Sequence, residues 1–191
     1  MSKSDGVIGI SDHGGWAVLV TAARDGTLLD RRRVELVDDD LPAIPHHHEA
    51  QMLSSDEGVA LVERVRASVE RYAAIALDAV TKDVGDVFGI ALRERQPLPP
   101  TIAERINDPV ARNVADWVMY RDVLASAAAA RALPVYWFEP KNVCSEAGRA
   151  LGLDSFDAHF LDLRRSLGSP WNQDHKLALA AAIVAANALA K

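Results

Sequence analysis

Residues 7–21 read VIGISDHGGWAVLVT, and this stretch decides the fold class. It begins with a β-branched run at residues 7–10, which is typical of a buried strand. A polar turn with two glycines, residues 11–15, leads into a second apolar run at residues 16–21. Two apolar runs joined by a short glycine-containing turn predict two neighbouring antiparallel strands.

A third strand extends this pair. Asp25-Gly26 is a hairpin signal, and residues 28–37 (LLDRRRVELV) follow it as a strand that Arg31 to Arg33 make polar on one side. The opening of the chain therefore predicts a three-stranded antiparallel meander.

Helices and strands alternate after the meander. Ser54 or Ser55 starts an amphipathic helix whose apolar residues recur three and four apart up to Val80. The later elements are expected to be a strand at 87–92, a helix at 110–132 opened by Asp108-Pro109, a strand at 133–138, a short helix at 143–151 and a final helix at 171–190. This order predicts an α/β fold with a mixed sheet, the meander plus parallel strands, flanked by helices in one domain over residues 1–191.

Composition narrows the function classes. Hydrophobic residues make up 49% of the 191 residues, which excludes a disordered chain. The formal net charge of −6 excludes a basic coat over the whole surface but allows a local basic face. The single cysteine, Cys144, fits a reducing compartment, and the longest apolar run, residues 177–186, is far shorter than a membrane span. We expect a cytoplasmic chain with no membrane partner.

The element order, with an aspartate and a glycine turn after the first strand, resembles the ribonuclease-H-like fold. Three stretches are similar to Holliday-junction resolvases of the RuvC type. Residues 8–18 look like the first strand and turn of that family, residues 133–143 like its fifth strand and exit, and residues 174–180 like the start of its final helix. The resemblance in element order covers most of the chain, whereas the resemblance in residues covers these stretches alone.

The resemblance implies a metal-dependent nuclease that cleaves phosphodiester bonds in nucleic acid, acting as a homodimer. Two Mg²⁺ ions about 4 Å apart can activate the attacking water and stabilise the leaving oxygen. The family brings acids from the first strand, the fourth strand and the last helix to one sheet edge, and here those elements offer Asp12, Glu94 and Asp174 as ligands for Mg²⁺ or Mn²⁺. His13 and His175 are the candidates for assisting proton transfer.

The chain departs from the family pattern in two places. The fourth strand, residues 87–92, contains no acid, and Glu94 stands beyond its end between Arg93 and Arg95, which compete with a metal for the space. The final helix carries no second acid one turn from Asp174. The alternative hypothesis is a catalytically silent module of the same fold that binds nucleic acid or a protein partner.

Each candidate acid also has a purely structural explanation. Asp12 suits a turn before two glycines, Asp174 suits the first turn of a helix, and Glu94 suits an ion pair with a neighbouring arginine. The nuclease hypothesis requires the carboxylates of Asp12 and Asp174 to lie within about 6 Å of each other in an open cleft. It is weakened if a cationic side chain fills that space.

Two further patterns leave alternatives open. His46-His47-His48 resembles a metal-binding tract, but in an extended stretch only the first and third of these histidines face the same way, and a surface loop explains it equally well. The first hairpin is also similar to that of sugar kinases and actin-like ATPases. That reading is disfavoured because one such half has no partner domain to close over a nucleotide.

Overall fold

A computed structural model describes residues 5–189, which contain a five-stranded mixed sheet in the order β3-β2-β1-β4-β5. The antiparallel meander consists of β1 (Gly6–Asp12), β2 (Trp16–Ala22) and β3 (Leu28–Glu35). On the other side of β1, β4 (Val87–Arg93) and β5 (Val135–Phe138) are added in parallel. The predicted mixed sheet, an antiparallel meander with parallel strands added, is therefore confirmed.

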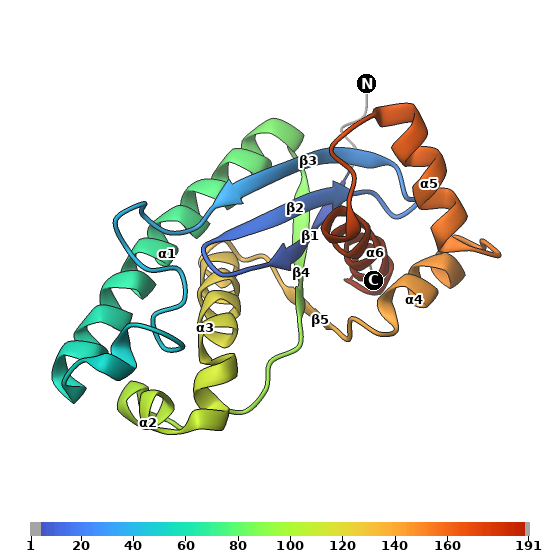
Figure 1. Cartoon of the computed structure of the whole chain (residues 1–191). Helices are drawn as coiled ribbons and strands as arrows, with labels where there is room; N and C mark the ends of the chain where they lie inside the picture. The colour runs from blue at the N-terminus through green and yellow to red at the C-terminus, as the bar shows by residue number, and fades with distance from the viewer. Residues whose placement is uncertain (1–4, 190–191) are drawn as a thin grey trace.

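Helices cover both faces of this sheet (Figure 1). One face packs against α1 (Ser55–Val84) and α3 (Pro109–Ala129), and the other packs against α6 (Gln173–Leu189), with α4 (Val143–Ala150) and α5 (Phe156–Leu167) beyond it. The interior is accordingly divided into two apolar cores, one on each side of the sheet. None of the helices in residues 5–189 is long and apolar enough to cross a membrane.

The two long helices on the first face begin where their capping residues predict. The Ser54 hydroxyl accepts a hydrogen bond from the backbone N–H of Glu57, whose carboxylate in turn binds the N–H of Ser54, which completes a capping box at the start of α1. The Asp108 carboxylate accepts from the first free N–H groups of α3, and Pro109 occupies the first helical position.

Two helices are missing from the sequence prediction. α2 (Ile102–Asn107) follows the proline-rich stretch directly and is capped by Thr101, and α5 is capped by Ser155. A six-residue helix is too short to show apolar periodicity, so its capping box was its only signal. A further short 3-10 helix covers Ala50–Met52.

Several element ends also differ from the prediction. β1 runs on through Ser11 and Asp12, which the sequence placed in the turn, because they pair with Val18 and Ala17 of β2. β3 and β5 are shorter than expected, and α6 begins two residues later than predicted. The predicted end of that helix at Ala190 lies outside the described residues.

The backbone of α6 lies directly on β1. A Cβ atom built on Gly9 would lie 1.8 Å from the carbonyl oxygen of Ala178 and 2.7 Å from the backbone nitrogen of Ala182. The buried side of α6 is mostly alanine, and Gly9 has no side chain, so helix and strand approach as closely as their backbones allow. This approach places the first turn of α6 beside the end of β1.

Replacing Gly9 with alanine is expected to lower the free energy of unfolding by about 1–3 kcal/mol, because backbone atoms of α6 would have to move away from β1. Urea denaturation would measure the loss. Gly6→Ala on the same strand is the matched control, since its added Cβ meets side-chain atoms first, Leu29 Cδ1 at 2.7 Å and Thr21 Cγ2 at 3.0 Å, and its nearest backbone neighbour, the Ala22 oxygen, lies at 3.3 Å. Equal stability of the two variants would contradict the proposed packing constraint.

Candidate functional site

The last two residues of β1, Ser11 and Asp12, face opposite layers of helices. Side chains alternate along a strand, so Ser11 lies on the same side as Val7, which belongs to the core under α6. Asp12 lies on the same side as Ile10, which belongs to the core under α1 and α3. The end of β1 therefore presents a hydroxyl group to α6 and a carboxylate to α3.

The Asp12 carboxylate forms a buried ion pair with Arg121 of α3. The Arg121 Nε donates to Asp12 Oδ2 at 2.8 Å, and the side chains of Arg121 and Asp12 are 9% and 0% exposed. A second guanidinium nitrogen of Arg121, Nη1, donates to the backbone oxygen of Glu94 at 3.1 Å. The other carboxylate oxygen of Asp12 is buried and has no hydrogen-bond partner in residues 5–189. The charge of Asp12 is thus already compensated by the protein.

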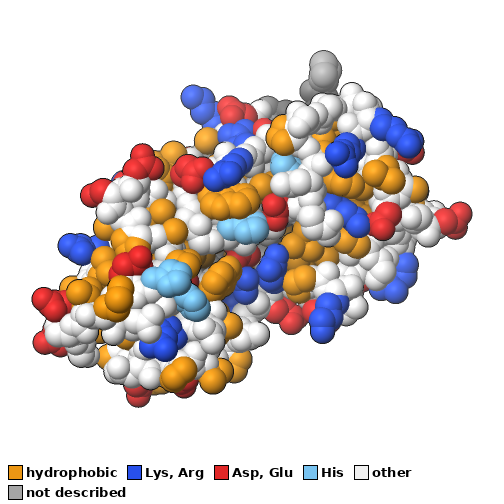
Figure 2. Space-filling view, viewed as in Figure 1, with side chains coloured by type: hydrophobic (Ala, Val, Ile, Leu, Met, Phe, Trp, Pro, Cys, Tyr) orange, Lys and Arg blue, Asp and Glu red, His pale blue; other side chains and the backbone are white. Residues whose placement is uncertain are grey.

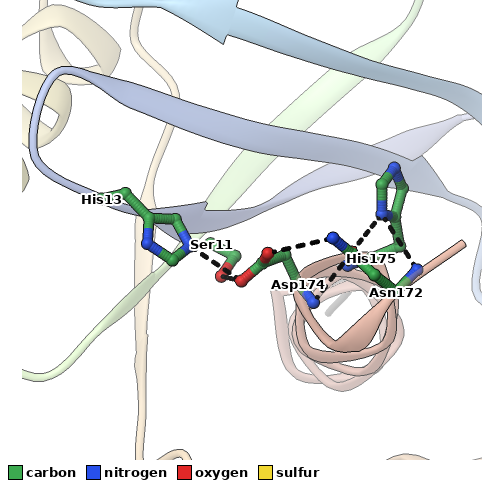
Figure 3. Close-up of polar contacts among 5 residues, drawn as sticks. All are labelled: Ser11, His13, Asn172, Asp174 and His175. Atoms are coloured by element: carbon green, nitrogen blue, oxygen red, sulfur yellow. Dashed lines mark hydrogen bonds and ion pairs between the residues drawn. The ribbon is translucent and has the colours of Figure 1, made fainter. Parts of the chain in front are cut away.

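Asp174 belongs to a separate polar cluster between the end of β1 and the start of α6 (Figure 3). Its Oδ1 accepts from the Ser11 hydroxyl at 3.2 Å and lies 2.8 Å from His13 Nε2, while its Oδ2 accepts from the Asn172 amide at 3.3 Å. The side chains of His13 and Asp174 are 36% and 22% exposed. This cluster is therefore reachable from solvent, unlike the Asp12 ion pair.

Aromatic and basic side chains continue this cluster along the surface. The His13 ring stacks on Trp16 with a centroid separation of 4.0 Å, and the Arg33 guanidinium lies 4.1 Å from the Trp16 ring centroid. Figure 2 shows basic and histidine side chains near the middle of this face of the molecule. Stacked π-systems with an adjacent cation suit a flat or anionic ligand.

His175 supports the helix start and does not touch the cluster's carboxylate. Its Nδ1 hydrogen-bonds to the Asn172 side-chain oxygen at 2.6 Å, and its ring lies 5.5 Å from that of Trp171. Burial lowers the pKa of His175, Arg31 lowers it further, and Asp174 acts in the opposite direction. These surroundings therefore favour the neutral imidazole.

Glu94 lies beyond the end of β4, as predicted. Its side chain is exposed and forms no hydrogen bond or ion pair within residues 5–189. Neither of the two flanking arginines bonds to it, and Lys176 pairs with Asp157 instead of entering the site. Of the three candidate acids, Asp174 is the one whose carboxylate contacts another candidate site residue, His13.

The arrangement does not fit a two-metal centre. Such a centre needs several free carboxylate oxygens directed at one place, and Asp12 is neutralised on the opposite side of the sheet from Asp174. Within residues 5–189, no group of three or more His, Cys, Asp or Glu side chains could hold a metal ion.

The sequence prediction did not include Arg121 or Ser11 among the site residues. The alternation of side chains along β1 was the available signal, because it places Asp12 on the same side as Ile8 and Ile10 and Ser11 on the other.

A cleft of about 480 Å³ opens beside the carboxyl ends of β4 and β5. Its walls combine arginines with an aromatic ring and two amides, from Arg93, Arg95, Arg121, Trp117, Gln96 and Asn113. Arg93 Nε is buried and has no hydrogen-bond partner in the described part of the chain. Arg95 lies 4.3 Å from the Trp137 ring centroid and pairs with Asp122. Glu94 also lines the cleft, and Arg121 and Arg95 are paired with Asp12 and Asp122, so Arg93 is the lining arginine without an ion pair within residues 5–189.

The lowered pKa of His175 predicts a loss of stability in acid. The unfolded chain takes up a proton on this residue at a higher pH than the folded chain does, so stability falls as pH drops through about 6.5. A His175→Gln variant should lose less unfolding free energy than the wild type between about pH 7.5 and pH 5.5 in urea denaturation. His48→Gln, at an exposed position, should keep the wild-type pH dependence. Parallel curves for wild type and His175→Gln would refute the prediction.

The solved structures similar to this chain include two of RuvC from Thermus thermophilus. RuvC in complex with a Holliday junction substrate shares 16% sequence identity over 95% of this chain and 92% of that chain, with a TM-score of 0.49. A second RuvC structure shares 15% identity over 95% of this chain and 93% of that one, with a TM-score of 0.43. No family model and no curated protein matches the sequence. At such identities the likeness concerns the fold alone.

Proposed function

We propose that this chain is a non-catalytic ribonuclease-H-like module that binds nucleic acid beside the carboxyl ends of its parallel strands. The ion pair between Asp12 and Arg121 carries the non-catalytic part of the proposal. A divalent cation at Asp12 would have to displace a buried guanidinium, which would then be left as a buried charge without a partner. Asp12 therefore serves the fold and not a metal.

The cleft beside β4 and β5 supports the binding part of the proposal. Arg93 lines the cleft and its guanidinium forms no hydrogen bond or ion pair within residues 5–189, so its charge is left for a phosphate. Trp117 offers an aromatic surface for a base, and the amides of Gln96 and Asn113 offer donors and acceptors. Cations beside an aromatic ring are the features that bind single-stranded nucleic acid without strict sequence preference.

A metal-dependent nuclease is the second candidate function. One observation favours it: Asp174 lies 2.8 Å from His13 at the end of β1, and both side chains are partly open to solvent. In that case Asp12, Asp174 and Glu94 would bind Mg²⁺ or Mn²⁺, with His13 and His175 assisting proton transfer. This function requires the Arg121 guanidinium to move away from the Asp12 carboxylate.

A homodimer and a cytoplasmic location remain predictions from the sequence.

Binding without cleavage is the result we expect when the chain is mixed with labelled single-stranded DNA, duplex DNA, a four-way junction and an RNA–DNA hybrid in Mg²⁺ or Mn²⁺. Fluorescence anisotropy would measure affinity, and denaturing gels would measure cleavage. Arg93→Gln should reduce the slope of log affinity against log salt by about 1, because one phosphate contact is lost.

Arg165→Gln is the control for this assay, since Arg165 is exposed on α5 and pairs with Asp162 away from the cleft. Absence of binding to all four substrates would overturn the nucleic-acid proposal and favour a protein partner. Metal-dependent cleavage that is lost in both Asp12→Asn and Asp174→Asn would establish the nuclease instead.

The ion pair itself predicts a stability pattern. Arg121→Met should lower the free energy of unfolding by about 3–5 kcal/mol, because it leaves the buried Asp12 carboxylate without its cation. The double variant Asp12→Ala with Arg121→Met should recover much of that loss, since no buried charge remains. Chemical denaturation of the two single variants and the double variant would measure the coupling. Simple additivity of the two single losses would show that the pair is not coupled.

A further inference from the structure

A second cavity lies among α1, α2 and α3, away from the end of β1. It has a volume of about 200 Å³ and shares no lining residue with the cleft beside β4 and β5. Its walls are partly apolar, from Val62, Ile102, Met119 and Val123. The first residue of the histidine tract, His46, also lines it. The cavity therefore combines an apolar wall with polar groups, His46 among them, that the proposed function does not use.

His46 is held in place by a buried carboxylate. Asp116 of α3 is fully buried, and its Oδ1 accepts from the backbone N–H of His46 at 3.1 Å and lies 2.7 Å from its ring Nδ1. The other carboxylate oxygen accepts from the backbone N–H of His47 at 3.1 Å. Because the carboxylate binds Nδ1–H, the ring is fixed in orientation and its Nε2 is left for another partner.

That second nitrogen has no partner within the protein. His46 is 1% exposed, and its Nε2 is buried without a hydrogen bond in residues 5–189. Buried polar atoms are nearly always hydrogen-bonded. An oriented imidazole nitrogen without a partner, on the wall of a cavity, indicates that a ligand supplies the partner.

The charges on the cavity wall indicate the sign of this ligand. The carboxylate of Glu70 is bound by Arg66 at 3.2 Å, and that of Asp122 is bound by Arg95. Arg105 donates to backbone oxygens, those of Pro99 at 2.7 Å and Pro100 at 3.2 Å, and forms no ion pair in the described part of the chain. Arg66 is also shared with Glu63 at 3.6 Å, so Arg105 is the wall cation in the described residues whose charge is left for an anionic ligand.

We propose that this cavity binds a small organic carboxylate, whose charged end lies between His46 Nε2 and Arg105 and whose short apolar body lies against Val62 and Met119. Binding of the carboxylate anion is accompanied by uptake of one proton from solvent onto Nε2, so that Nε2–H donates to the ligand while Nδ1–H remains on Asp116. Negative and positive charges then alternate from Asp116 through the imidazolium to the ligand. This site requires neither nucleic acid nor a metal, and it stands apart from the proposed function.

The test is a titration of the full chain with sodium benzoate, compared with sodium chloride at equal ionic strength. Proton NMR would follow the Hε1 signal of His46, with the five other histidines as internal references. We expect a saturable shift of the His46 signal with benzoate only. Acetate, which lacks the apolar body, should bind more weakly. Arg105→Gln should weaken benzoate binding by about tenfold or more, because a charged hydrogen bond is lost.

Arg112→Gln is the matched control, because Arg112 also donates to a backbone oxygen, that of Ile106, but does not line the cavity. Arg105→Lys keeps the charge and should restore part of the affinity. Unchanged signals from the other histidines would show that each variant is folded. No saturable shift of His46 with benzoate, an equal shift with chloride, or equal affinity in Arg105→Gln would each overturn the proposal.

Discussion

The close approach of α6 to Gly9 is the constraint on which the candidate site depends. A helix can rest its backbone on a strand only where the strand has no side chain and the helix has small ones. Gly9 and the alanines of α6 meet both conditions. Once this approach is fixed, the first turn of α6 must lie beside the end of β1, and Asp174 comes within hydrogen-bond distance of Ser11 and His13.

The alternation of β1 then separates the two aspartates that a nuclease would need together. Gly9 faces α6, so the residue two positions later, Ser11, faces it as well, and Asp12 must face α3. The residue that meets the acid of the last helix is consequently a serine. Asp12 meets Arg121, which is 109 positions away in the sequence. A shift of one residue at this strand would exchange these partners.

The sequence predicted what local signals encode. The two glycines after β1, the Asp-Gly hairpin and the capping residues of α1 and α3 specify their elements within a few positions, and those elements formed where expected. The pairing of Arg121 with Asp12, and of Asp116 with His46, depends on how distant elements pack. No local pattern marks which residue of α3 meets β1. The opposite facing of Ser11 and Asp12 was the one long-range feature that strand alternation alone could have revealed.

Arg121 also joins the ends of the two central strands. Its Nε binds the Asp12 carboxylate at the end of β1, and its Nη1 binds the backbone oxygen of Glu94 just beyond β4. In a metal site, a divalent cation bound by acids on both strands would place positive charge between the same two strand ends. A guanidinium supplies that charge permanently, with fixed hydrogen-bond directions and no dependence on metal concentration. The chain's own cation thereby links the two strand ends, and Arg93 beside it forms no ion pair within residues 5–189.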